Sequence, residues 1–372
     1  FFINLFIFLM LKYCLLFIFM CCYASTQGQS ISEDSVEQKQ DSIKENTLLK
    51  SLGNGYFPTK YFNFDKVLPS YTDDLQETGS TNFLTDGRFF QFFEPRLLNI
   101  NLFHKHITKS ISIEHKINDR LSSETEFSIS KIDPTYNYTY ILNNAAYSNF
   151  NLSTAKIALQ WNPFDYFEMT KTNVKEIKEG FPKFSLQYTK SFQDVFKGDL
   201  GFSKVDFRTI HRIGNEDNHF SEITLVSGLA SGNTPLTHLY HAYPNNITKE
   251  TILQRFSVAG LNSFETMFFN EFFSDKFITI QLKHRLRPFK VSKRFQPYMV
   301  LISRYAIGDI KNPERHQNIT FGSLKKGYTE SGFEINKLLF GFGLSFTYRY
   351  GAYYLPEFAD NVAFKFTFNV SL

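Results

Sequence analysis

The sequence predicts an all-β fold, a transmembrane antiparallel β-barrel of about 12–16 strands behind an N-terminal signal peptide. Three observations lead to this prediction. Short segments alternate between large apolar and small polar residues, the chain holds 44 Phe and 20 Tyr in 372 residues, and its one long apolar run lies at the start. Aromatic rings pack well on a pleated sheet. The slightly negative mean hydropathy excludes a bundle of membrane helices beyond that first run.

The alternation is clearest in FGFGLSFTYRYG, residues 340–351. Every even position from Phe340 to Tyr350 is large and apolar or aromatic, and the positions between them are Gly, Ser, Thr or Arg. A strand therefore gains one apolar face and one small, polar face. The apolar face would contact lipid in an outer-membrane barrel and a second sheet in a soluble sandwich. The polar faces hold mainly Ser, Thr, Asn, Gln and Gly, which favours a barrel interior.

Other segments repeat this pattern. They are 111–117 and 121–129 on either side of the polar turn Asn118-Asp119-Arg120, then 155–161, 184–188, 278–282 and 364–372. The last segment, FKFTFNVSL, keeps its apolar face up to Leu372, and outer-membrane barrels commonly end on such a strand. Aromatic clusters at strand ends, Tyr136/Tyr138/Tyr140 and Tyr348/Tyr350/Tyr353/Tyr354, fit the girdles that barrels place at membrane interfaces.

Residues 1–24 are expected to be a signal peptide with its start at Met10. Lys12 supplies the positive region, an apolar core follows, and small residues surround Ala24. Read from Phe1, the same run is long enough, at about 23 residues, for a membrane anchor. The three cysteines all lie in this run, so cleavage leaves a chain without cysteine. That composition suits an outer-membrane protein that crosses the oxidising periplasm unfolded.

The rest of the chain divides into two parts. Residues 25–52 are polar and nearly free of aromatics, which predicts a flexible linker. Residues 53–372 are expected to form the barrel domain. The formal charge of +4 comes from well-mixed basic and acidic residues. This distribution lacks the concentrated basic face that nucleic-acid binding requires.

Motifs for catalysis are missing from the sequence. GSLKKG at 322–327 lacks the spacing of a phosphate-binding loop, and SGLASG at 227–232 lacks that of a nucleophile elbow. His104 and His106 are two apart and would share a strand face, but no third metal ligand follows from the pattern, so we interpret them as interior or loop histidines. No enzymatic activity, cofactor or metal is therefore predicted.

Two acidic clusters are the candidate lumen or rim charges. Glu271 and Asp275 flank the aromatic pair in EFFSD, and YTESGFEIN contributes Glu330 and Glu334, followed by Arg349 and Asp360. An unpaired buried charge is expensive, so Glu330 or Glu334 is expected to pair with Arg349 inside the barrel or at its rim. The alternative interpretation is a charged constriction that selects ions or solutes.

From Asn162 onward the sequence resembles a family of uncharacterised Gram-negative outer-membrane proteins, in which a carboxypeptidase-regulatory-like domain precedes a large C-terminal barrel region of unknown function. The motifs that carry the resemblance are NPFDYFEMTKTNVKEIKEGFPKFSLQYTK (162–190), Gly232/Pro235/Leu239, Phe264/Met267/Glu271/Phe272/Ser274/Asp275, GYTESGFEINKLL (327–339), TYRYGAYYLP (347–356) and DNVAFKFTF (360–368). Residues 50–150 match only faintly, and the regulatory-like domain has no counterpart, so the chain resembles a shortened member. A more distant similarity is to outer-membrane assembly and translocation barrels.

The resemblance implies a bacterial outer-membrane location without a settled activity. The expected function is solute passage or envelope assembly and export. The expected partners are outer-membrane lipid and, during biogenesis, the barrel-assembly machinery and periplasmic chaperones; no nucleic acid is expected, and the solute stays unidentified. The alternative is a secreted or periplasmic soluble all-β binding protein, whose Phe and Tyr residues would fill a sandwich core.

Overall fold

The computed structural model describes residues 57–58, 63–64, 66–79, 102–118, 120–169, 174–178, 180–215, 219–248, 257–260, 262–289, 291, 295–339 and 342–368. The chain divides into two units, Phe1–Asn54 and Gly55–Leu372, and every described residue belongs to the second. The expected signal peptide (1–24) and linker (25–52) therefore lie outside the described residues.

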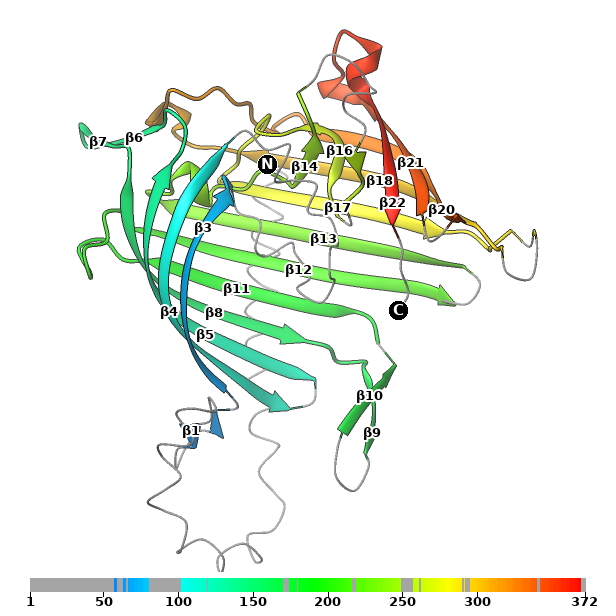
Figure 1. The fold of residues 1–372 in the computed structure, drawn as a ribbon, viewed down its shortest axis with the longest axis horizontal. Helices are drawn as coiled ribbons and strands as arrows, with labels where there is room; N and C mark the ends of the chain where they lie inside the picture. Colours follow the sequence, from blue (N-terminus) through cyan, green and yellow to red (C-terminus); the bar gives the residue numbers. More distant parts are fainter. Residues whose placement is uncertain are drawn as a thin grey trace, which may run out of the picture. The chain divides into compact units, whose positions relative to one another are not determined.

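A thirteen-stranded sheet dominates the second unit, in the order β15-β22-β21-β20-β18-β17-β13-β12-β11-β8-β5-β4-β3 (Figure 1). Its long strands are β3 (Lys66–Glu77), β4 (Phe103–Asn118), β5 (Leu121–Pro134), β8 (Phe150–Trp161), β11 (Lys183–Ser191), β12 (Phe202–Asn215), β13 (His219–Gly232), β17 (Lys276–Arg285), β18 (Tyr298–Asp309), β20 (Tyr328–Leu339), β21 (Phe342–Tyr350) and β22 (Val362–Phe368). These twelve pair antiparallel, and the two-residue β15 (Ser257–Val258) lies parallel to β22.

Smaller elements lie before β3 and in the connections. They are β1 (Phe57–Pro58), β2 (Asn63–Phe64), β6 (Thr139–Leu142), β7 (Ala145–Tyr147), β9 (Tyr166–Met169), β10 (Val174–Lys178), β14 (Pro244–Asn246), β16 (Phe264–Phe268) and β19 (His316–Gln317), with the 3-10 turns η1 (Leu236–His238), η2 (Pro313–Arg315), η3 (Gly351–Tyr353) and η4 (Phe358–Asn361). Within the described ranges, none of the helices is long and apolar enough to cross a bilayer.

The predicted all-β class is confirmed, and the strand number falls within the expected range. The segments expected at 155–161, 184–188 and 278–282 lie in β8, β11 and β17. In the described residues no ladder joins β3 to β22, so closure of the sheet into a barrel stays a prediction.

Consecutive long strands are neighbours, so their connections fall at two ends of the sheet. At one end the connections are 78–102, 135–149, 192–201, 233–275, 310–327 and 351–361; at the other they are 119–120, 162–182, 216–218, 286–297 and 340–341. The three shortest connections all lie at this second end, which we call the short-turn end. At one of them the Asn118 side-chain oxygen accepts a hydrogen bond of 2.9 Å from the Arg120 amide, which closes the tight turn between β4 and β5.

One face of the sheet is mainly apolar and exposed, and the other holds most of the buried polar and charged side chains, together with apolar ones such as Val300 and Ile302. The described parts of the 233–275 connection (233–248, 257–260 and 262–275) lie against one face, which we call the inner face. On β21, Leu344 points outward and is 46% exposed, whereas the inward Thr347 is 0% exposed. On β17, Ile280 is 40% exposed and the inward Gln281 is buried. The predicted alternation is therefore correct, with the apolar residues on the uncovered face.

The end of the sheet opposite the short-turn end, which we call the long-connection end, holds a cluster of buried apolar residues. The cluster includes Tyr138, Tyr140, Phe202 and Phe273. Tyr138 and Tyr140 are 2% and 1% exposed, so they do not form the interface girdle that the sequence suggested. Tyr140 lies in β6, and Tyr138 comes directly before that strand. Because β6 pairs with β19 of the 310–327 connection, both rings lie against His316. The sequence pattern could not reveal this, because the two connections are far apart along the chain.

His316 is expected to make this cluster sensitive to acid. Its Nδ1 lies 2.9 Å from the Tyr138 hydroxyl, which accepts a hydrogen bond of 3.1 Å from the Leu236 amide. Burial first, and then the charge of Arg315, lower the pKa of His316 to about 4. Protonation thus favours the unfolded form, so stability is complete above pH 6.5, falls as the pH drops toward about 4, and then levels off.

This loss amounts to roughly 3 kcal/mol at most, at 1.36 kcal/mol per pKa unit. Thermal unfolding of the wild type and of His316→Gln is compared at pH 7.5 and pH 4.5. Other groups titrate equally in both proteins, so the wild type should lose more stability than the variant. Equal losses would show that His316 does not contribute to the acid sensitivity.

Candidate functional site

The connection from β13 to β17, residues 233–275, is the inserted segment. In it β14 and β16 pair parallel, and the Phe264 amide donates to the Tyr243 carbonyl at 3.0 Å. β16 contacts β21 and β22 of the sheet, and both short strands are labelled in Figure 1. Phe264, Met267 and Phe272 are buried in one cluster with side chains of the sheet's inner face. The hydrophobic effect therefore holds the segment against the sheet.

The segment approaches the sheet closely at Gly228 of β13. A Cβ atom at this position would lie 2.4 Å from Cζ of Tyr240. The Tyr240 ring stacks on Phe277 with centroids 4.5 Å apart, and the Lys204 ammonium lies 4.4 Å from its centroid. Burial first, and then the charge of Asp206, raise the pKa of Tyr240 well above its ordinary value. The phenol is therefore neutral. Position 228 has to be a glycine, because a side chain there would overlap the Tyr240 ring.

Glu330 of β20 binds the segment to the sheet. Its two carboxylate oxygens accept hydrogen bonds of 3.0 Å from the backbone amides of Glu265 and Thr266, and the Thr266 hydroxyl donates at 2.5 Å. Arg304 of β18 donates to the same carboxylate at 2.7 Å, and neither charged side chain is exposed. One buried anion thus satisfies donors from the sheet and from the segment.

Arg349 of β21 provides a second attachment. Its guanidinium donates two hydrogen bonds, of 2.6 and 3.1 Å, to the carboxylate of Glu271 in the segment. The guanidinium carbon also lies 4.8 Å from the centroid of the Tyr328 ring. A two-pronged contact fixes direction as well as distance, so it sets the position of the C-terminal part of the segment.

Glu265 forms a third attachment, with Lys365 of β22. Its carboxylate accepts hydrogen bonds from Asn245, Gly260 and Ser263, and the Lys365 ammonium lies 3.8 Å away. Lys365 also donates to the Asn245 carbonyl and, at 2.7 Å, to the Ser257 hydroxyl. Burial raises the pKa of Glu265, while Lys365 and then Arg304 oppose the rise.

The residues proposed from the sequence have different positions in this arrangement. Glu330 and Arg349 face each other across the β20–β21 ladder, but their ionic partners differ from the expected ones: Glu330 pairs with Arg304, and Arg349 with Glu271. Asp275 accepts a hydrogen bond of 2.7 Å from the Lys311 amide at the long-connection end. Asp360 lies in η4, within the 351–361 connection. Both aspartates thus lie in connections and not in the strands of the sheet.

Sequence reasoning missed Arg304, Glu265 and Lys365. Lys365 had a signal, since it is the charged residue on the polar, inward face of FKFTF, next to Thr367. Arg304 had none, because its inward neighbours Val300 and Ile302 are apolar and hide the polar face of β18. Glu265 lies in the short strand β16, in which residues on both faces are buried, so no alternation of polarity marks it.

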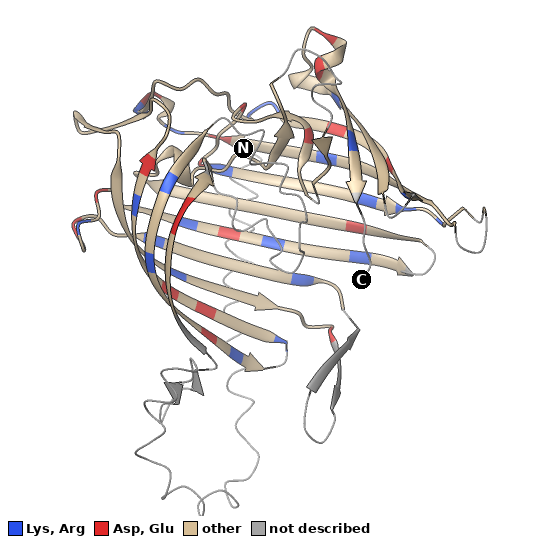
Figure 2. Cartoon of the chain, viewed as in Figure 1, with Lys and Arg blue, Asp and Glu red and all other residues tan. Residues whose placement is uncertain are grey.

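Other inward charges are paired along the same face. Lys156 lies 2.6 Å from Glu126 and 3.0 Å from Glu124, and Arg212 lies 2.7 Å from Glu222. Figure 2 shows blue and red positions distributed over most of the strands. His104 is buried, and His106 Nδ1 contacts Gln76 at 2.7 Å. Among the described residues no cluster suits a metal ion.

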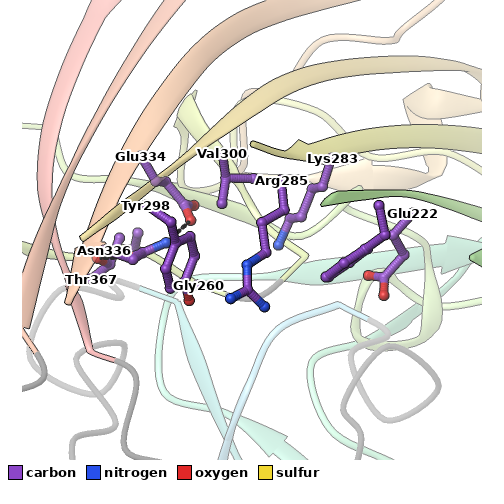
Figure 3. A pocket seen from close by; sticks show the side chains of 11 residues that line it. Glu222, Gly260, Lys283, Arg285, Tyr298, Val300, Glu334, Asn336 and Thr367 are labelled. Atoms are coloured by element: carbon purple, nitrogen blue, oxygen red, sulfur yellow. Dashed lines mark hydrogen bonds between the residues drawn. The ribbon is translucent and has the colours of Figure 1, made fainter. Parts of the chain in front are cut away.

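A cavity of about 170 Å³ opens on the inner face near the short-turn end. Figure 3 shows Arg285 and Lys283 of β17 reaching into it, with Glu222 on one side and Glu334 on the other. The Arg285 guanidinium carbon lies 4.2 Å from the centroid of the Tyr298 ring. Glu334, a sequence-predicted residue, is thus a cavity wall, and the Asn336 amide donates to it at 3.2 Å.

These features define a class of protein: a large antiparallel sheet with an apolar outer face, a charged inner face and a segment bound inside. The model of a family described as "Family of unknown function (DUF5686) C-terminal domain" matches residues 78–228, less than half of the chain. The matched range includes the part in which the sequence resemblance was faint. It ends before the inserted segment.

The crystal structure of BamA from Haemophilus ducreyi lacking POTRA domains 1–3 is similar, with a TM-score of 0.45 and 10% sequence identity. The similarity covers 71% of this chain and 54% of that one, so the chain spans about half the length of that structure. A comparison with curated proteins gives no match.

Replacement of Gly228 should loosen the inserted segment. In Gly228→Ala the new methyl group overlaps Tyr240, and overpacking of this kind costs about 1–3 kcal/mol. Hydrogen exchange in residues 236–246 should become faster than in the wild type. Gly201→Ala is the control, because its added Cβ would lie at an ordinary 3.4 Å from Gln193. Equal protection in all three proteins would contradict the close packing of Tyr240.

Removal of the Arg349 charge should release the C-terminal part of the segment. Arg349→Gln leaves Glu271 without its ionic partner. The expected loss of stability is at the lower end of roughly 3–5 kcal/mol, because Glu271 keeps some contact with water. Faster hydrogen exchange is expected in residues 262–275. The double variant Arg349→Gln/Glu271→Gln should recover part of the protection, since no charge is stranded.

Arg212→Gln is the matched control for this experiment. It removes an arginine that pairs with a glutamate at 2.7 Å, but its partner Glu222 belongs to β13 and not to the segment. Exchange in 262–275 should stay at the wild-type rate. Acceleration in this control as large as in Arg349→Gln would mean that any loss of inner-face charge disturbs the segment.

Proposed function

We propose that the protein is a bacterial outer-membrane β-barrel without enzymatic activity, whose lumen holds the inserted segment. The proposal rests on the distribution of polar and apolar side chains, which is the reverse of that in a soluble protein. Large apolar residues such as Phe342, Leu344 and Ile280 are exposed on the outer face, while Glu330, Arg304 and Lys365 are buried inside. Leaving apolar surface in water costs about 25 cal/mol per Å², whereas hydrocarbon removes that cost and a lumen accommodates the charges.

The connections support one orientation in the membrane. Outer-membrane barrels have short periplasmic turns and longer external loops. We place the short-turn end in the periplasm, with the inserted segment entering from the external side, where β13 ends and β17 begins. The cavity beside Arg285 then faces the periplasmic half of the lumen.

The inserted segment favours controlled passage over an open diffusion pore. Three attachments, at Glu330, Arg349 and Lys365, hold it against four neighbouring strands. The candidate functions are solute transfer and envelope assembly or export. For either one, the inserted segment would have to move or to serve as a fixed surface. Outer-membrane lipid, the barrel-assembly machinery and periplasmic chaperones are the partners that this proposal entails.

A secreted or periplasmic binding protein is the second candidate, and the inner-face cavity is the observation in its favour. Such a protein would have to cover the aromatic outer face with another surface. In the described residues the outer side chains of β17, β21 and β22 stay uncovered. The two candidates differ in the cell fraction in which the protein is found.

The experiment has two arms. The full chain is expressed in a Gram-negative host, and its outer-membrane fraction is run on a gel with and without boiling. A heat-dependent band shift is expected, because a folded barrel resists cold detergent. The purified protein is then placed in a planar bilayer, where Arg349→Gln should show more frequent open events than the wild type.

Soluble protein in the periplasmic fraction, without a band shift, would refute the membrane proposal and favour the binding protein. Membrane protein with identical, steady conductance in wild type and variant would keep the location and reject control by the inserted segment. Arg212→Gln again serves as the control for the bilayer arm.

A further inference from the structure

The cavity near the short-turn end has the features of an anion-binding site. Its volume of about 170 Å³ is similar to that of an engineered cavity of about 150 Å³ that binds benzene. A phosphate group, or a carboxylate with a few carbon atoms, fits this space. Its walls come from β13, β17, β18, β20 and β22 and from Gly260 of the inserted segment.

The charges around the cavity have a positive balance. Its walls contain Lys283 and Arg285 as cations and Glu222 and Glu334 as carboxylates. Arg212 adds a third cation, since it donates to Glu222 at 2.7 and 3.1 Å. Whichever contacts the two carboxylates make, the formal charges of these three cations and two carboxylates add up to a positive value. An anion entering from water therefore meets a favourable electrostatic field.

Arg285 has the geometry for recognition of an oxyanion. Its guanidinium carbon lies 4.2 Å from the Tyr298 ring centroid and 5.8 Å from that of Phe220. Contact with an aromatic face limits the orientations of the planar group. In Figure 3 the guanidinium extends into the space between Tyr298 and Glu222. A guanidinium held in this way can offer two parallel N–H donors to a phosphate or a carboxylate.

On the opposite wall of the cavity, a hydrogen bond holds the Glu334 carboxylate in place. The Asn336 amide donates to Glu334, and the Asn336 side-chain oxygen accepts from the Thr367 hydroxyl. These hydrogen bonds link β20 to β22. The carboxylate is therefore fixed on the far side of the cavity from Glu222, and the cations of β17 lie between the two, as Figure 3 shows.

We propose that this cavity binds an oxyanion, the phosphate or carboxylate group of a small solute or of a lipid headgroup, with Arg285 as the principal contact and Lys283 as the second. The inference does not depend on the membrane location, because the cavity and its charges belong to the sheet itself. A free anion and a lipid headgroup share this chemistry, and the test separates them.

The test uses the full chain in a phosphate-free detergent. Inorganic phosphate is titrated, and phosphorus NMR line broadening gives the dissociation constant. Arg285→Gln should weaken binding about tenfold, as expected for the loss of a charge-assisted hydrogen bond. Arg285→Lys should fall between the two, because it keeps the charge without the planar fork. Circular dichroism verifies that each variant keeps its strand content.

Arg287→Gln is the matched control. It removes the same charge two residues further along, from an exposed side chain in the 286–297 connection, and should leave the dissociation constant unchanged. Absence of saturable broadening in the wild type would overturn the proposal. Equal weakening in Arg285→Gln and Arg287→Gln would also overturn it, since only net charge would then matter.

Two competition arms identify the source of the anion. Micelles containing phosphatidylglycerol that displace phosphate support a lipid headgroup as the occupant, and displacement by sodium acetate alone supports a soluble carboxylate. Phosphate binding that neither competitor affects supports a free phosphorylated solute. Because these measurements require no bilayer, they can succeed even where the membrane proposal fails, and the reverse holds as well.

Discussion

The carboxylate of Glu330 is the contact on which the interior of this protein depends. It lies with no exposed surface between the Arg304 guanidinium and two backbone amides of the inserted segment. An uncompensated buried carboxylate costs several kcal/mol, so each of these donors is needed where it is. Because the donors come from both the sheet and the segment, the charge cannot be satisfied unless the segment is inside.

The remaining attachments extend this constraint. Arg349 and Lys365 lie on the next two strands and meet Glu271 and Glu265 of the segment. Three cations and three carboxylates thus form an almost neutral layer between the sheet and the segment. Buried ion pairs contribute little net stability, but their geometry selects one arrangement. Apolar packing around Phe264 and Met267 supplies the attraction, and the ion pairs determine the position.

The same alternation serves two environments. Outward aromatic and aliphatic residues suit a hydrocarbon surrounding, and inward polar residues provide the partners for the segment and the walls of the cavity. A single-residue slip in register would exchange the two faces. Long antiparallel ladders such as the fourteen-residue strands β12 and β13, paired from Phe202 with Gly232 to Asn215 with His219, prevent such a slip.

The sequence by itself determined the fold class, the tight turn between β4 and β5, and the direction of most strand side chains, because alternation with period two is a local property. It also identified Glu330, Glu334 and Arg349 as interior residues. Only the tertiary structure decided their partners: Arg349 meets Glu271 from 78 residues away, and Arg304 takes the place expected for Arg349 beside Glu330. Such pairs depend on strand register and on the path of a long connection, and no period in the sequence specifies either.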